Sequence, residues 1–280
     1  MTQLIRHRSL GAPTLILVLL FTQSAAHAIR PFVTDDARVV GARLGQVESW
    51  LIFDKQQIAQ NALFAIGPTK WLEITSGFTH GGGFNSAWGG HSITGGIFQI
   101  KALIRETKSG DWPGLAFAAG VVPSFGSGSL KPDGVSTFGY AALSQSFFND
   151  DLMFHANLGV ATIKEETQWK PTLTAGFGFQ AKIMGKLNSV GEIYRGDPYD
   201  PTKRFMASQV GFRYIFNSNF QMDGTLGSTL EKDSQQWVSV GVRIVSPELW
   251  QLAANCSLPS QLHYLEILMN GFKIATFFSC

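Results

Sequence analysis

Residues 171–183 read PTLTAGFGFQAKI, and every second residue in this stretch is apolar. The apolar set is Leu173, Ala175, Phe177, Phe179, Ala181 and Ile183, and it alternates with Thr172, Thr174, Gly176, Gly178, Gln180 and Lys182. Successive side chains of a β-strand point to opposite faces, so this period of two predicts a strand with one apolar and one polar face.

The same alternation, bounded by Gly, Pro, Asn and Asp, recurs along most of the chain and predicts about twelve strands. We place them at 44–54, 57–66, 71–80, 92–104, 114–122, 136–147, 151–161, 171–183, 187–196, 205–216, 219–228 and 236–246. Most are close to the nine to eleven residues with which a tilted strand crosses a bilayer. With no helical stretch to cover their apolar faces, they predict an all-β fold, a single antiparallel up-and-down transmembrane β-barrel.

Composition agrees with a barrel in lipid. Charged residues make up 15% of the chain, against roughly 25% in soluble domains. The alternative is a soluble β-barrel or sandwich with the apolar faces turned inward, but its outer faces would need many Lys, Glu and Asp. The formal net charge of +2 gives no reason to expect nucleic acid as a partner.

The N-terminus has the pattern of a secretory leader. A basic region at 6–8 precedes the short apolar run 15–21 and the small-residue site Ala26-His27-Ala28. This order predicts a signal peptide over 1–28. The barrel is then expected over 29–250, and no later run of residues is apolar enough for a membrane helix.

The connections between the predicted strands alternate in length. Tight turns are expected at 149–150, 185–186 and 217–218, and longer polar loops at 164–170, 196–204 and 231–235. A bacterial barrel with short periplasmic turns and longer outer loops gives this pattern. The segment 106–113 is long for an inner turn and counts against the scheme.

Alternation also assigns polar side chains to the interior of the barrel, because a charge facing hydrocarbon at mid-depth costs about 2–4 kcal/mol. The residues predicted to line the lumen and a permeation path are Glu73, Gln99, Lys101, His155, Asn157, Gln180, Lys182, Glu192, Gln209, Arg213, Asp223 and Arg243. Opposite charges inside a narrow barrel either form a pathway with an internal field or hold the wall together.

Two small constellations invite a chemical interpretation. His155, with Ser144 or Ser146 on the preceding strand, has the residue types of a lipid hydrolase, although no Gly-x-Ser-x-Gly elbow is present. Thr34-Asp35-Asp36 offers paired carboxylates, which without further ligands make a poor Ca²⁺ site. A capped turn or a short plug is the structural alternative. The histidines show no metal-ligand spacing, and neither a metal nor a cofactor is expected.

The stretch 30–37, RPFVTDDA, together with Gln46-Val47-Glu48-Ser49 and Trp71-Leu72-Glu73-Ile74, resembles the outer-membrane proteins named for the MetA pathway of phenol degradation. The resemblance covers about residues 30 to 250. It implies an outer-membrane barrel linked to uptake of aromatic or other hydrophobic compounds, and it brings no catalytic residues.

The end of the chain departs from that pattern. Trp250 would suit the aromatic end of a last strand, which the outer-membrane insertion machinery reads, yet residues 251–280 follow it. This extension is either passive or a periplasmic plug or partner-binding tail closed by a Cys256–Cys280 disulfide.

These observations together predict a passive channel or transporter in the bacterial outer membrane for small hydrophobic or aromatic compounds, without a cofactor and not an enzyme. The expected partners are the lipid bilayer, the insertion machinery and the solute. The alternatives are a structural or adhesive barrel with a filled interior, and a barrel lipid hydrolase around His155.

Overall fold

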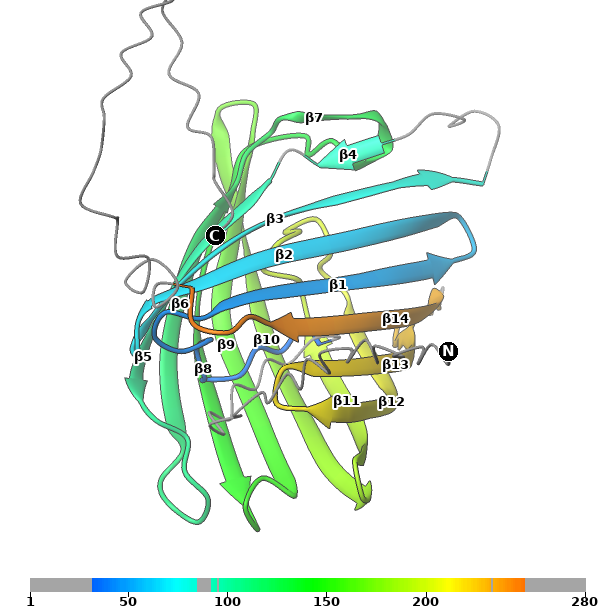
Figure 1. The fold of residues 1–280 in the computed structure, drawn as a ribbon. Coiled ribbons are helices and arrows are strands. Elements are labelled where there is room, and N and C mark those ends of the chain that lie inside the picture. Colours follow the sequence, from blue (N-terminus) through cyan, green and yellow to red (C-terminus); the bar gives the residue numbers. More distant parts are fainter. Residues whose placement is uncertain (1–31, 85–91, 95, 233, 250–280) are drawn as a thin grey trace, which may run out of the picture.

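Fourteen strands form one antiparallel sheet in the computed structural model, which describes residues 32–84, 92–94, 96–232 and 234–249 (Figure 1). Twelve of them are long: β1 Gly45–Asp54, β2 Gln57–Thr69, β3 Leu72–Gly83, β5 Ile97–Arg105, β6 Gly114–Val122, β8 Ser136–Phe147, β9 Leu152–Glu165, β10 Gln168–Met184, β11 Leu187–Arg195, β12 Met206–Asn217, β13 Phe220–Thr229 and β14 Gln236–Val245. The short strands β4 Ser92–Thr94 and β7 Gly126–Ser127 and the 3-10 turn Gly128–Leu130 lie in loops.

The sheet closes on itself because the first and last strands pair. β1 and β14 run antiparallel in register from Gln46 opposite Val245 to Asp54 opposite Trp237. Every other neighbour along the chain also pairs, so the long strands form a twelve-stranded up-and-down barrel. Closure leaves no strand edge with unpaired backbone groups, which is the condition for a sheet to stand in hydrocarbon. No helix in the described part of the chain is long and apolar enough to span a bilayer.

The predicted strands are confirmed in number and, within a few residues, in position. Two details were wrong. The stretch 92–104 is divided into β4 and β5, and 164–170 is not a long loop. β9 and β10 continue as a hairpin to a turn at Glu166, whose φ is +53°, with Glu165 opposite Gln168. The hairpin continues here although its side chains are polar, because strand pairing still supplies the hydrogen bonds of the backbone N–H and C=O groups where the hairpin projects beyond the bilayer.

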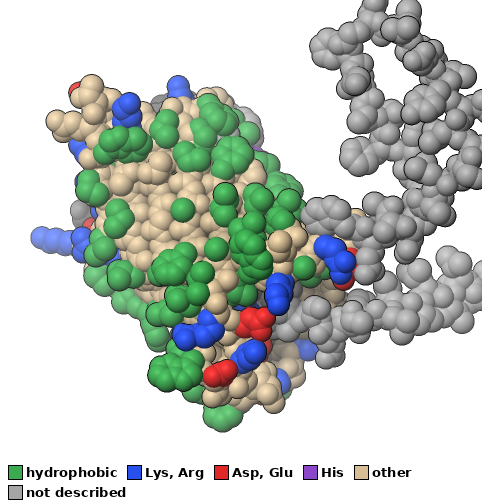
Figure 2. Space-filling model, turned by 90° about the vertical axis from the view of Figure 1, so that its left-hand side faces the viewer, with side chains coloured by type: hydrophobic (Ala, Val, Ile, Leu, Met, Phe, Trp, Pro, Cys, Tyr) green, Lys and Arg blue, Asp and Glu red, His purple; other side chains and the backbone are tan. Residues whose placement is uncertain are grey.

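The outer face of the barrel is apolar. Large hydrophobic side chains at mid-strand are more than half exposed, among them Leu158 at 62%, Val210 at 58% and Leu226 at 62%. Figure 2 shows such side chains spread over one outer face, while charged side chains gather toward its borders. The face assignment made from alternation in β10 is confirmed, since Leu173, Phe177 and Ile183 are exposed whereas Thr172, Thr174 and Gln180 are buried.

The two ends of the barrel differ in their connections. One end, here called the turn end, carries the tight turns between β2 and β3, β8 and β9, β10 and β11, and β12 and β13. The opposite end, the loop end, carries most of the longer connections, including 196–205 between β11 and β12. The connection 106–113 between β5 and β6 is an exception, because it is long and lies at the turn end. Short turns face the periplasm in barrels of this kind. The predicted signal peptide, the extension 251–280 and its two cysteines lie outside the described residues and stay predictions.

Candidate functional site

The polar residues predicted for the lumen lie on the inner face of the barrel wall, and the structure brings most of them into one buried region. Those with at most 8% exposure are Glu73, Gln99, Lys101, His155, Gln180, Glu192, Gln209, Arg213, Asp223 and Arg243. There are two exceptions, the partly buried Asn157 and the exposed Lys182. Lys182 lies at the turn end beside the bulge that ends β10, where the lumen meets solvent, and it pairs there with Asp151 at 2.8 Å. Whether the buried residues serve permeation stays a prediction.

The interior is filled by the chain's own N-terminal stretch, residues 32–44, here called the plug segment. Figure 1 shows its dark-blue trace running behind β1 and β14 into the barrel. At its start, the backbone N–H groups of Val33 and Thr34 donate to the two carboxylate oxygens of Glu192 at 2.9 and 2.8 Å. The ring of Phe32 packs on Val190 of the same strand. The short plug considered for Thr34-Asp35-Asp36 is therefore what the structure contains.

Asp35 lies at the centre of the plug segment's contacts. One carboxylate oxygen lies 2.8 Å from the Lys101 ammonium and accepts a hydrogen bond of 2.7 Å from the Tyr140 hydroxyl. The Asn157 side chain bonds both the N–H and the C=O of Asp35. Lys101 is nearly fully buried, and Asp35 compensates its charge together with Glu73, which lies opposite Lys101 on the neighbouring strand.

The second half of the plug segment crosses to the opposite wall. The N–H of Ala37 donates to Ser144 Oγ at 2.8 Å, and the N–H of Val40 donates to Glu73 Oε2 at 2.8 Å. Arg38 pairs with Asp150 at the turn end at 2.8 Å. Residues 32–40 are thus held by wall side chains from several strands, whereas Arg43 and Leu44 exchange backbone hydrogen bonds with Gly67 of β2.

Inner-face glycines make room for the plug segment. A methyl group added at Gly176 would lie 2.2 Å from Thr34 Oγ1, whereas one added at Gly178 would meet nothing closer than 3.4 Å. Overpacking of this kind costs typically about 1–3 kcal/mol. We therefore expect Gly176→Ala to loosen the segment and Gly178→Ala, on the same face of the same strand, to leave it in place.

The loosening is measured as access of a thiol reagent to the buried position Ala37, with Ala37→Cys placed in a background where Cys256 and Cys280 are serine. We expect Gly176→Ala to raise the labelling rate by roughly tenfold, the factor that corresponds to about 1.4 kcal/mol. Equal rates in the Gly176→Ala and Gly178→Ala proteins would contradict the placement of Thr34.

A second obstruction comes from the loop end, where residues 196–205, here called the outer loop, fold into the barrel. The Tyr199 hydroxyl donates to Gln99 Oε1 at 3.1 Å, and its ring meets Phe138 edge-on at 5.2 Å between centroids. Lys203 holds the loop's shape by lying 3.5 Å from Asp200 Oδ2 and 3.6 Å from Asp197 Oδ2.

Electrostatics within the outer loop supports that shape. Burial alone would raise the pKa of Asp200, but the Lys203 ammonium and the hydrogen bonds from Thr202 outweigh burial and hold that pKa below its usual value. Burial likewise acts to lower the pKa of Lys203, and the Asp200 and Asp197 carboxylates more than reverse this. The loop is thus ion-paired at neutral pH.

Between the plug segment and the outer loop remains a small cavity of about 50 Å³, lined among others by Asp35, Lys101, Tyr140 and Tyr199. A space of this size holds a few water molecules at most. Within the described part of the chain, the plug segment and the outer loop together leave little free space beside Lys101.

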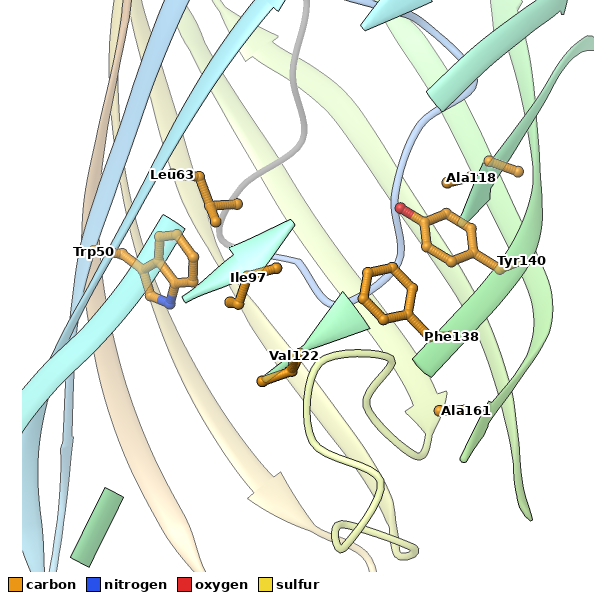
Figure 3. Close-up of a cluster of buried hydrophobic side chains, with 9 residues drawn as sticks. Trp50, Leu63, Ile97, Ala118, Val122, Phe138, Tyr140 and Ala161 are labelled. Carbon is orange, nitrogen blue, oxygen red and sulfur yellow. The ribbon is translucent and has the colours of Figure 1, made fainter. Parts of the chain in front are cut away.

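Toward the loop end, one side of the inner wall carries an apolar cluster. Its buried side chains are Trp50, Leu63, Ile97, Ala118, Val122, Phe138, Tyr140, Ala142 and Ala161, and Figure 3 labels all of them except Ala142. On β10 and β12 to β14 the inner wall toward the same end is polar, with buried Thr172, Gln209 and Ser239, so the apolar surface covers only part of the outer half.

The serine–histidine pair considered for catalysis does form. Ser144 Oγ lies 2.9 Å from His155 Nδ1 on the neighbouring strand. The same hydroxyl accepts the Ala37 N–H, so the pair holds the plug segment in place. Ser146 bonds Asp150 instead. Among the described residues no group of three or more His, Cys, Asp and Glu side chains is arranged to hold a metal ion.

Two residues of the site were not singled out from the sequence. Tyr140 shares the inner-face parity of Ser144 on β8, so alternation was the signal that would have found it. Tyr199 lies in a loop, where no periodicity exists to reveal that it folds inward.

A closed antiparallel barrel with an apolar belt outside and its charged side chains inside is an outer-membrane β-barrel protein. Within that class, the chain belongs to the family described as uncharacterised conserved protein UCP029691, whose model matches residues 16–246. This match carries no reference to phenol degradation. A search of curated proteins finds no match to the chain.

Solved structures share the fold at low sequence identity. The KdgM porin in complex with disordered oligogalacturonate aligns with a TM-score of 0.51 at 11% identity, covering 71% of this chain and 98% of the porin. The COG4313 outer membrane channel from Pseudomonas putida F1 aligns with a TM-score of 0.51 at 10% identity, covering 72% of this chain and 94% of the channel. Both are outer-membrane barrels, and at this identity the likeness concerns the fold.

Proposed function

We propose that this protein is a passive outer-membrane channel for small aromatic or other hydrophobic compounds, closed at rest by its plug segment. The observation that carries the proposal is that residues 32–40 of the segment fill the lumen without joining the sheet. They are held by side chains such as Glu192 and Lys101 rather than by a β-ladder, so they can leave while every strand pairing stays intact.

The plug segment also has a place to bend. Gly41 has a φ of +100° and Arg43 a φ of +63°, both just before β1. A backbone turn at this point lets the residues upstream swing out of the turn end while Gly45 stays paired in the barrel. No energy source is required, because the solute would move down its own gradient.

The solute class is supported by the wall and by the sequence resemblance. A molecule that passes the outer loop at the loop end meets the apolar side chains of Trp50, Ile97 and Phe138 on one side of the wall. Transfer of apolar surface from water to such a wall is favourable. The channels and porins that share the fold support a channel role, and the sequence resemblance to proteins named for phenol degradation supports the solute class. The insertion machinery of the outer membrane is the assembly partner that we propose.

The test is a deletion of residues 32–42 in the full-length protein, measured in planar bilayers. We expect the parent to be closed for most of the time and the deletion to carry a steady current. The control is the folded state, read as resistance to SDS until boiling. A folded deletion protein that carries no current would favour the alternative of a structural barrel with a filled interior.

A further inference from the structure

We propose that Lys101 and Tyr140 form a carboxylate-binding site for the solute, and that Asp35 of the plug segment occupies it in the closed channel. The ligand class is a small aromatic carboxylate. This inference rests on the proposed channel function and makes it more specific: solute and plug segment compete for the same two donors.

The contacts of Asp35 define the site. A single carboxylate oxygen receives both the ammonium of Lys101 at 2.8 Å and the hydroxyl of Tyr140 at 2.7 Å. Charge-assisted hydrogen bonds of this kind are about twice as strong as neutral ones. Since the wall supplies both donors and the plug supplies only the acceptor, any carboxylate that reaches this point can take the place of Asp35.

Because Lys101 is buried, the loss of its ion pair with Asp35 destabilises the lumen. The Lys101 side chain is 4% exposed, and its one ion pair within the described residues is with Asp35. Glu73, opposite Lys101 on the neighbouring strand, instead accepts hydrogen bonds from Val40 and Thr75. When the plug segment leaves, Lys101 loses Asp35 and Glu73 loses the Val40 N–H, so Glu73 is the wall carboxylate that remains opposite the ammonium, and an anion that enters the lumen competes with it for Lys101.

The surroundings suit an aromatic body behind the carboxylate. The rings of Phe138 and Tyr140 lie nearly parallel, 6.3 Å apart with 15° between their planes, and Tyr199 packs edge-on against Phe138. Offset and edge-to-face ring contacts of this kind are favourable beyond the burial of area. A benzoate-like molecule with its carboxylate at Lys101 would lie along this wall.

The small volume beside Lys101 prevents the solute and Asp35 from occupying the site at the same time. The cavity next to Lys101 measures about 50 Å³ while the plug segment is in place, well below the roughly 300 Å³ at which ligand pockets begin. The solute therefore enters only where Asp35 and its neighbours withdraw, and solute binding would itself favour the open state.

The experiment measures binding of benzoate, with neutral benzamide as the matched ligand, to the purified full-length protein in detergent by calorimetry. Asp35→Asn removes the internal competitor and keeps the shape of the side chain. We expect it to tighten benzoate binding roughly tenfold or more, the effect of one charge-assisted hydrogen bond. Benzamide needs the same withdrawal of the plug segment, so its binding should tighten by a similar factor while staying weaker than that of benzoate.

Two further variants separate the site from general charge effects. Lys101→Gln in the Asp35→Asn protein is expected to abolish the preference for benzoate, whereas Lys182→Gln, at the turn-end mouth, is expected to keep it. Resistance to SDS before boiling shows that each variant is folded. Equal binding of benzoate and benzamide in Asp35→Asn, or a benzoate preference that survives Lys101→Gln, overturns the site.

The bilayer current of the deletion of residues 32–42 distinguishes the two proposals. If that protein conducts and benzoate shows no dependence on Lys101, the channel stands and the carboxylate site falls. If it does not conduct while benzoate still binds at Lys101, the channel falls and the site remains as a binding site in a closed barrel.

Discussion

Replacing Glu192 with alanine is expected to shift the channel from mostly closed toward open. The Glu192 carboxylate accepts the N–H groups of Val33 and Thr34, and hydrogen bonds to a charged group contribute about 1.5–3 kcal/mol each. Loss of both corresponds to roughly a hundredfold or larger rise in the ratio of open to closed protein, at tenfold per 1.4 kcal/mol. The measurement is the open probability of single channels in planar bilayers.

The matched control is Glu231→Ala, which removes an exposed carboxylate from the connection between β13 and β14. It is expected to leave the open probability unchanged. If Glu192→Ala stays as closed as the parent while the barrel remains folded, the plug segment does not hold the channel shut, and the outer loop with Tyr199 becomes the obstruction to test next.

Replacing Leu158 with arginine is expected to destabilise the inserted barrel by about 2–4 kcal/mol, the cost of such a charge at the bilayer midplane. Leu158 lies midway along β9 and is 62% exposed on the outer face. The loss is measured as a shift of the unfolding free energy in denaturant, with the protein folded into lipid vesicles.

The control is the same substitution at a position close to the membrane surface. Phe216 lies on the same outer face but next to the last residue of β12, at the turn end. Arginine there should cost about 0–1 kcal/mol, as found for charges near the interface. Equal and small effects at both positions would mean that water rather than hydrocarbon surrounds the barrel, and the membrane assignment would be wrong.

The strands were predictable from sequence because each repeats the same physical rule. In 171–183 the apolar side chains fall on one face and the polar ones on the other, and the structure exposes Leu173 while it buries Thr174. The same rule placed Glu192 and Lys101 inside. The hairpin around Glu166 was misjudged because its polar residues read as a loop, although strand pairing continues beyond the lipid.

The plug segment was only partly predictable, because residues 32–44 have no periodicity. What fixes their position is a set of contacts with distant parts of the chain, such as Glu192, 158 residues from Thr34. A carboxylate predicted on an inner face must have a hydrogen-bond or ion-pair partner. The local sequence does not identify which residue that partner is. The pairing of Asp35 with Lys101 is information that only the closed barrel contains.

The register of β1 against β14 has a consequence for biogenesis. Gln46 receives a hydrogen bond from Arg243, 197 residues later, so the ring cannot shut until the last strand has been delivered. Contacts so remote in sequence carry a large loop-closure entropy and are slow to form. Residues 32–44 directly precede β1, so they are already held next to the β1–β14 pair when it forms. The protein is therefore expected to complete its folding with the plug segment inside the barrel.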